Sequence, residues 1–242
     1  MLPALLCSLV ALAPLPAAAG PHDHGEAAGH DDAPGGDAEG AEGAAEEAPP
    51  APVTWTIDPA QGTTLLRVQK DESTLVSGMS HDHVVVARDH SGSFTWNAAD
   101  PAACRLLVRL PVARLLVDPP EVRAQQGLEG ELSDAQREDV RRNMLSKDQL
   151  WASSHPFITF ESEACLGDGD SFEMQGDLSI RGRSRSVILK GALTTDDAGF
   201  RIQGELRIRA TDFGFEPYTA MFGQLKNQDQ MTLVVDLGGS AR

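Results

Sequence analysis

Short runs of alternating apolar and polar residues recur along the chain from Trp55 onward. Turns rich in Gly, Asp, Asn or Pro separate one run from the next. A period of two places the apolar side chains on one face of a strand, so the repetition predicts an antiparallel sheet with one apolar face. The apolar positions of these runs are Leu106, Val108, Leu110 and Val112; Ile158 and Phe160; Leu178 and Ile180; Val187 and Leu189; Ile202, Leu206 and Ile208; and Leu233, Val235 and Leu237.

One helix is predicted, from Ser133 to about Gln149. Ser133 and Gln136 have the spacing of a capping box, and Val140, Met144 and Leu145 form an apolar stripe on a charged surface. The stretch 119–130 before it is predicted to be a long connection between strands. Because one helix cannot cover a whole apolar sheet face, we expect the sheet to close on itself as a β-barrel, with the helix as a partial lid at an open end.

The chain is expected to have three parts. Residues 1–19 are predicted to be a signal peptide, because an apolar run over residues 4–13 is followed by the small residues Ala17 to Ala19. Residues 20–53 hold nine of the 36 acidic residues and no Lys or Arg, and they contain almost no large apolar residue. Such a segment cannot bury enough surface to offset its conformational entropy, so a disordered linker is predicted. Residues 54–242 form the barrel.

The composition of the chain disfavours some classes of binding partner. The net charge of −16 and the aromatic content of 5% disfavour nucleic acid as a partner, because phosphate would be repelled and few rings are present to stack on bases. No apolar run is long enough to predict a transmembrane span. The signal peptide predicts export to the periplasm or the extracellular space. The sequence leaves open whether the barrel forms a homodimer.

Five segments stand out in order along residues 54–238: Trp55 to Pro59, His83 with Gly92 to Phe94, His155 to Ser162, Gly176 to Gly182, and Thr211 to Gly214. Together they resemble the YceI-like family of polyisoprenoid-binding proteins. This resemblance implies an all-β, lipocalin-like, extended antiparallel β-barrel with one helix near an open end. It also implies an exported, non-catalytic protein that holds a long apolar isoprenoid-like or amphiphilic lipid and needs no cofactor.

The inward positions of the barrel are the candidates for contact with such a lipid. They are mostly mid-sized aliphatic residues, with few rings to fill a wide interior. Each buried CH₂ group of a ligand would contribute about 0.8 kcal/mol to binding. The candidate ligand-binding residues are Met79, His81, His83, Leu106, Val108, Leu110, Ile158, Phe160, Leu178, Ile180, Val187 and Leu189.

A metal-binding exported protein is the alternative. His81 and His83 would share one face of a strand, and a third ligand could come from His90 or His155. The 20–53 segment adds a His-rich stretch that could also capture a metal ion. The competing interpretation is that one histidine of the pair hydrogen-bonds inside the barrel mouth and the other is solvated.

Two cysteines remain after the predicted cleavage, Cys104 and Cys165, and in an exported chain they predict a disulfide. The alternation pattern argues against this disulfide. Cys104 lies two residues before inward Leu106, whereas Cys165 lies two residues after outward Glu163, so the two cysteines would point to opposite faces. Bridged cysteines on neighbouring strands should lie on one face. A β-bulge near the barrel rim would restore the match.

Overall fold

The computed structural model of the protein describes residues 51–74 and 77–240. The predicted signal peptide (1–19) lies outside the described residues, as does nearly all of the predicted linker (20–53), including its histidines. Regular structure begins at Val53, one residue before the expected start of the barrel.

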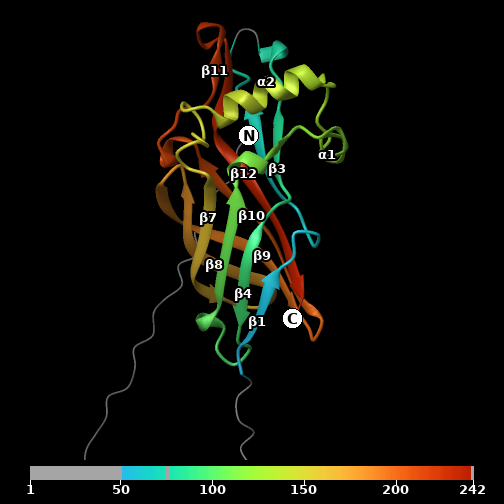
Figure 1. Ribbon diagram of the computed structural model, residues 1–242, viewed down its shortest axis with the longest axis vertical. Helices are drawn as coiled ribbons and strands as arrows, with labels where there is room; N and C mark the ends of the chain where they lie inside the picture. Colours follow the sequence, from blue (N-terminus) through green and yellow to red (C-terminus); the bar gives the residue numbers. More distant parts are fainter. Residues whose placement is uncertain (1–50, 75–76, 241–242) are drawn as a thin grey trace, which may run out of the picture. The chain divides into compact units, whose positions relative to one another are not determined.

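An antiparallel β-barrel forms the centre of the fold, as the sequence predicted, and it has eight strands (Figure 1). Thr56 of the first strand pairs with Ser240 of the last, which closes the sheet and leaves no open edge at that end. In barrel order the strands are β1 (Val53–Ile57), β4 (Ser91–Trp96), β5 (Arg105–Pro111), β7 (Phe157–Leu166), β8 (Gly169–Ile180), β9 (Arg183–Thr195), β10 (Gly199–Arg209) and β12 (Leu225–Ser240).

Three further strands extend the barrel wall from the middle of β12. They are β2 (Thr64–Lys70), β3 (His83–Ala87) and β6 (Leu116–Val117), in the order β12-β2-β3-β6. β2 pairs with β12 from Met231 to Val234, on the same edge of β12 that meets β1 further along. A short strand, β11 (Thr219–Ala220), pairs with the beginning of β12. We name β2, β3 and β6 together the extension.

The predicted helix is present as α2 (Asp134–Leu145) and begins with the expected capping box of Ser133 and Gln136. It ends at Leu145, before the expected Gln149. The stretch 119–130 belongs to the connection between β6 and β7, as expected, but it contains a second helix, α1 (Pro120–Gln125), that was not predicted. The short 3-10 helices are η1 (Ser77–Met79), η2 (Pro101–Ala103), η3 (Val112–Arg114), η4 (Thr211–Phe213) and η5 (Met221–Gly223).

Helix α1 forms for reasons that strand periodicity does not reveal. Proline at its first position is preset for the helical backbone and lacks only an N–H that would be unsatisfied there anyway. Its Val122 is buried against Leu65, Val84 and Val86, on the outer face of the extension. Burial of this one apolar residue therefore anchors a helix too short to be stable alone.

The closed end of the barrel is densely packed with aromatic side chains. Phe94 lies between Trp55 and Phe200, with ring centroids 5.9 Å and 4.9 Å away, and aromatic pairs at such distances stabilise beyond their buried area. Trp96 and Phe172 complete the aromatic group. This end of the interior therefore forms a solid core.

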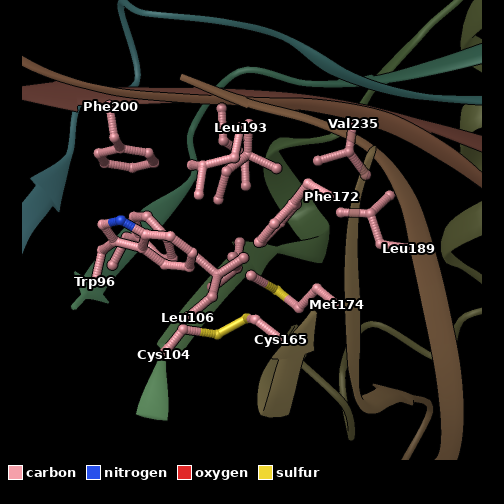
Figure 2. Packing of buried hydrophobic residues seen from close by; sticks show 14 of the residues in the cluster. Trp96, Cys104, Leu106, Cys165, Phe172, Met174, Leu189, Leu193, Phe200 and Val235 are labelled. Atoms are coloured by element: carbon pink, nitrogen blue, oxygen red, sulfur yellow. A yellow bond between two sulfur atoms is a disulfide. The ribbon is translucent and has the colours of Figure 1, made fainter. Parts of the chain in front are cut away.

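A disulfide joins Cys104 and Cys165 at the same end, as predicted, with 5.9 Å between the two Cα atoms (Figure 2). The predicted bulge is also present. The pairing of β7 with β8 shifts register between Ser162 and Ala164, so Glu163 is the extra residue. The shift turns Cys165 to the inside, where it is fully buried like Cys104.

Candidate ligand-binding site

Two adjoining apolar cavities lie inside the described part of the barrel, beyond the aromatic core. The smaller, of about 70 Å³, is within the eight-stranded barrel, and the larger, of about 160 Å³, lies between the extension and α2 and is partly open to solvent. Thr64, Ile158 and Ile180 line both cavities. Side chains common to both volumes mean that the two cavities form neighbouring parts of one interior space.

The smaller cavity is lined by every inward aliphatic and aromatic residue named as a ligand contact from the alternation. These side chains reach it from β5, β7, β8 and β9, and several are only half-buried by protein atoms although they face inward. The nine residues are Leu106, Val108, Leu110, Ile158, Phe160, Leu178, Ile180, Val187 and Leu189.

An inward glycine also shapes this space. A Cβ atom on Gly176 of β8 would lie 2.6 Å from the ring of Phe160 and 2.4 Å from the carbonyl oxygen of Glu161. Atoms do not approach a Cβ so closely without displacement, so glycine at this position lets the Phe160 ring and the β7 backbone pack directly against β8.

The larger cavity is built mainly from elements that the sequence analysis did not assign to the site. The alternation of Leu66 and Val68 could have indicated that β2 contributes to the cavity. The segment 210–218 has no such periodicity. From α2, Val140 and Met144 line the cavity, so the helix is the partial lid that was expected. The unpredicted apolar lining residues are Leu65, Leu66, Val68, Val85, Ala87, Leu115, Leu150, Ile208, Ala210, Phe215, Pro217 and Met231.

Polar side chains gather on one side of the larger cavity. Asn143 of α2 donates a hydrogen bond of 3.3 Å to the hydroxyl oxygen of Tyr218, and Tyr218 is 37% exposed. Gln149, Asn227 and Gln228 are also part of the lining. Among the described residues, no Asp, Glu, Lys or Arg lines either cavity. The space can therefore accept an apolar chain inside and hydrogen-bond a polar group at its opening.

His83 lines the larger cavity and is fixed by a hydrogen bond to a buried carboxylate. Its Nδ1 lies 2.6 Å from Oδ2 of Asp118, and Asp118 accepts hydrogen bonds at Oδ1 from the Val84 amide and the Arg123 guanidinium, both at 2.9 Å. Asp118 and Arg123 are buried. Arg123 also donates to the carbonyl oxygens of Asp82 and Glu129, at 2.7 and 2.8 Å.

These contacts set the charge of the Asp118 carboxyl. Burial alone would raise its pKa, but the hydrogen bond and charge of His83, the Val84 amide and the Arg123 guanidinium together hold the pKa below its usual range. Asp118 therefore stays ionised. The sequence pattern contained no sign of this network, since its members come from β3, from the segment after β6 and from α1.

Met79 and His81 were also named as ligand contacts, and neither lines a cavity. Met79 is 64% exposed in η1. His81 precedes β3 and lies near Gly130 instead of sharing a strand face with His83.

Within residues 51–74 and 77–240, no group of three or more His, Cys, Asp or Glu side chains is placed to hold a metal ion. In the same residues, no helix has the length and apolar character to cross a membrane.

An antiparallel barrel with a packed closed end, an apolar interior space and a helix at the open end defines a lipocalin-like β-barrel. The family is shown by the sequence. The chain belongs to the YceI-like domain family, whose model matches residues 55–238.

Curated relatives match a shorter stretch of the chain. A UPF0312 protein of Azotobacter vinelandii is 26% identical over 136 residues, which cover 53% of this chain and 62% of that protein. Protein YceI of Escherichia coli O157:H7 is 26% identical over 139 residues, which cover 52% of this chain and 63% of that protein. The matched stretch is therefore less than two thirds of each relative's length.

A solved structure shares the fold. The crystal structure of Burkholderia cenocepacia BcnA superposes with a TM-score of 0.55 at 17% sequence identity, and the match covers 76% of this chain and 99% of that chain. At this identity the likeness concerns the arrangement of strands and helices alone.

Proposed function

We propose that this protein is an exported, non-catalytic carrier that holds a long apolar lipid, isoprenoid-like or another amphiphile, along the two adjoining cavities. The observation that supports this proposal best is the shared lining of the cavities by Thr64, Ile158 and Ile180. A lining shared in this way suits a chain that runs from the open end towards the aromatic core.

The lining favours a lipid over a polar metabolite. Burial of a charged group without a partner would cost several kcal/mol, on the order of 5 kcal/mol, in such a space. Each CH₂ group transferred from water would contribute about 0.8 kcal/mol. The amide and hydroxyl groups of Asn143, Tyr218 and Gln228 at the open side can hydrogen-bond a polar head group.

Export is part of the proposal. The Cys104–Cys165 disulfide supports an oxidising compartment such as the periplasm, because disulfides persist there and are rare in the cytosol. The family to which the chain belongs is consistent with a small apolar ligand as partner.

Native mass spectrometry of the purified mature protein tests the proposal, with two adjacent substitutions compared. Val187→Trp adds a large ring inside the smaller cavity. Ile188→Trp adds the same ring on the outer face, where Ile188 is 49% exposed. We expect a co-purifying hydrophobic mass in the wild type and in Ile188→Trp, and its loss in Val187→Trp.

Urea denaturation of both variants shows whether each one folds. A folded Val187→Trp protein that keeps its lipid would contradict the proposal. A wild-type protein that carries no hydrophobic mass, and takes none up from added isoprenoid lipid, would contradict it as well.

A further inference from the structure

The hairpin formed by β11 and the beginning of β12 carries an exposed apolar tip. Its turn is η5, in which Met221 is 53% exposed and Phe222 is fully exposed. Met221, Phe222 and Gly223 all have positive φ angles, of 50°, 56° and 85°. A left-handed backbone is unusual for large side chains, and here it turns Met221 and Phe222 away from the protein. We name residues 218–225 the apolar hairpin.

A second exposed apolar residue comes from a distant part of the sequence. Helix η1 packs on β12, and its Met79 is 64% exposed. Met79 was expected to contact the ligand but lines neither cavity. In Figure 1 the apolar hairpin, near the label β11, and α2 lie at the same end of the barrel.

The apolar hairpin is uncharged. Residues 218–225 contain no Asp, Glu, Lys or Arg, although 23% of the whole chain is charged. The first charged residue after it, Lys226, lies 3.9 Å from the carboxylate of Asp71. Transfer of residues 218–225 into an apolar phase therefore desolvates no charged side chain of the hairpin itself.

The same hairpin is part of the cavity wall. Tyr218 is its first residue, Pro217 precedes it, and Asn227 and Gln228 come shortly after it; all four residues line the larger cavity. The Asn227 amide donates to the Tyr218 carbonyl oxygen at 3.0 Å, which joins the two arms directly below the tip. Whatever binds Met221 and Phe222 would thus lie next to the wall of the larger cavity, at the side where its lining residue Tyr218 is 37% exposed.

We propose that the apolar hairpin inserts Met221 and Phe222 into a lipid bilayer, so that the cavity opening faces the membrane from which the ligand is taken or to which it is delivered. Transfer of the ligand between the cavity and the membrane rests on the proposed function, in which the ligand is a lipid. A few exposed apolar side chains suffice for shallow insertion. They are too few for a stable protein interface, which buries about 1,200–2,000 Å².

Co-sedimentation with phosphatidylcholine vesicles tests the insertion. The double variant Met221→Ser, Phe222→Ser should bind the vesicles at least about a hundredfold more weakly than the wild type, because it loses both apolar side chains. The control is Leu166→Ser, which removes another exposed apolar side chain, 67% exposed, at the residue after the disulfide-bonded Cys165. It should bind as the wild type does. Unchanged urea midpoints would show that all three proteins are folded.

A direct probe of depth is Phe222→Trp. Its fluorescence should be quenched by phosphatidylcholine with brominated chains and protected from iodide in water. Absence of vesicle binding by the wild type, equal binding by the double variant, or quenching by iodide alone would each overturn the proposal. Dimerisation through the hairpin, seen by sedimentation velocity together with absent vesicle binding, would identify a second copy as the occupant and overturn it too.

The outcome is separable from that for lipid binding. Vesicle binding that depends on the hairpin, in a protein without any hydrophobic mass, would support the insertion and contradict the carrier function. A lipid-loaded protein that ignores vesicles would support the carrier function and contradict the insertion.

Discussion

Nδ1 of His83 lies 2.6 Å from Oδ2 of Asp118, at the wall of the larger cavity. On its other oxygen Asp118 accepts from Arg123, so one buried carboxylate links the start of β3 to α1. The histidine is thereby fixed in orientation beside the larger cavity. Because Asp118 and Arg123 are both buried, loss of either partner would leave the other charge without compensation, so the stability of the extension depends on this pair.

Asp118→Asn should destabilise the protein by about 3 kcal/mol, because it leaves the buried Arg123 guanidinium without its carboxylate. Urea denaturation at neutral pH measures this loss. The control is Asp89→Asn, since Asp89 pairs with Arg114 at 2.6 Å on the surface, where removal of one partner changes stability by about 1 kcal/mol or less. Equal effects of the two substitutions would contradict the importance of the buried pair.

The acid dependence of stability should also change in Asp118→Asn. The pKa of Asp118 is below its usual value in the folded protein, so the unfolded chain takes up the proton first as the pH falls. The contribution of this carboxylate is complete above the usual carboxyl pKa and is lost as the pH falls through the lower folded value. Wild-type stability should therefore fall more steeply in acid than that of the variant, measured by urea midpoints.

His90 should make the protein less stable in mild acid. It is buried, and within the described residues neither ring nitrogen has a hydrogen-bond partner. Burial lowers its pKa from 6.5, although the Ala87 backbone and the Asp58, Asp89 and Asp236 carboxylates oppose that shift. The unfolded chain thus binds the proton first, and stability is lost as the pH falls below about 6.5.

His90→Phe should remove this component. We expect its free energy of unfolding to change less than that of the wild type between about pH 7 and pH 5. Denaturant titrations at both pH values measure the difference. An equal change in the free energy of unfolding between the two pH values, in both proteins, would show that the His90 ring is hydrated or paired in the folded state.

Ile158→Asp and Phe160→Asp should each abolish lipid retention and destabilise the barrel. A carboxylate at either position would be buried in an apolar space without a partner, at a cost of several kcal/mol, about 3–5 kcal/mol. Ile188→Asp, on the outer face, is the control. Lipid extraction and urea denaturation give the two readouts, and a folded, lipid-loaded Ile158→Asp protein would place the ligand elsewhere.

The disulfide should be complete and strongly stabilising. Thiol titration of the unfolded, unreduced mature protein should find no free cysteine. Cys104 and Cys165 are 61 residues apart, so replacement of both by Ala should lower the free energy of unfolding by roughly 4 kcal/mol in the chain-entropy picture. Two free thiols per chain would mean that the cysteines are only small buried residues.

Deletion of residues 20–52 should leave the melting temperature of the mature protein unchanged. The barrel begins with Val53, which pairs with Trp96, and Ala51 and Pro52 are exposed. A large fall in the melting temperature would show that the deleted segment packs on the barrel.

The interior of the eight-stranded barrel was predictable from the sequence because its strands are long and alternate regularly. Leu106, Val108 and Leu189, for example, face inward as their parity predicts. Prediction of the disulfide needed one further assumption, because simple alternation puts Cys104 and Cys165 on opposite faces. A β-bulge between them resolves this conflict, and the register shift at Glu163 is that bulge. Local rules of strand geometry were sufficient for both.

The larger cavity was less predictable because it depends on contacts between distant segments. Nothing in the local sequence of β2 indicates that this strand lies outside the eight-stranded barrel and pairs with the middle of β12. The Asp118–Arg123 ion pair likewise requires α1, whose six residues carry too weak a periodicity to be recognised. His81 was placed on a strand with His83, but β3 begins only at His83.

The long strand β12 has two successive neighbours along one edge, β2 from Met231 to Val234 and β1 from Gly239 to Ser240. The ladder to β2 is short and interrupted by a register shift, whereas β10 pairs with β12 without interruption from Gln230 to Ser240. Short ladders open at a lower free energy than the core of a domain, so the amides at the β2 edge should exchange with solvent before those of the disulfide-linked barrel.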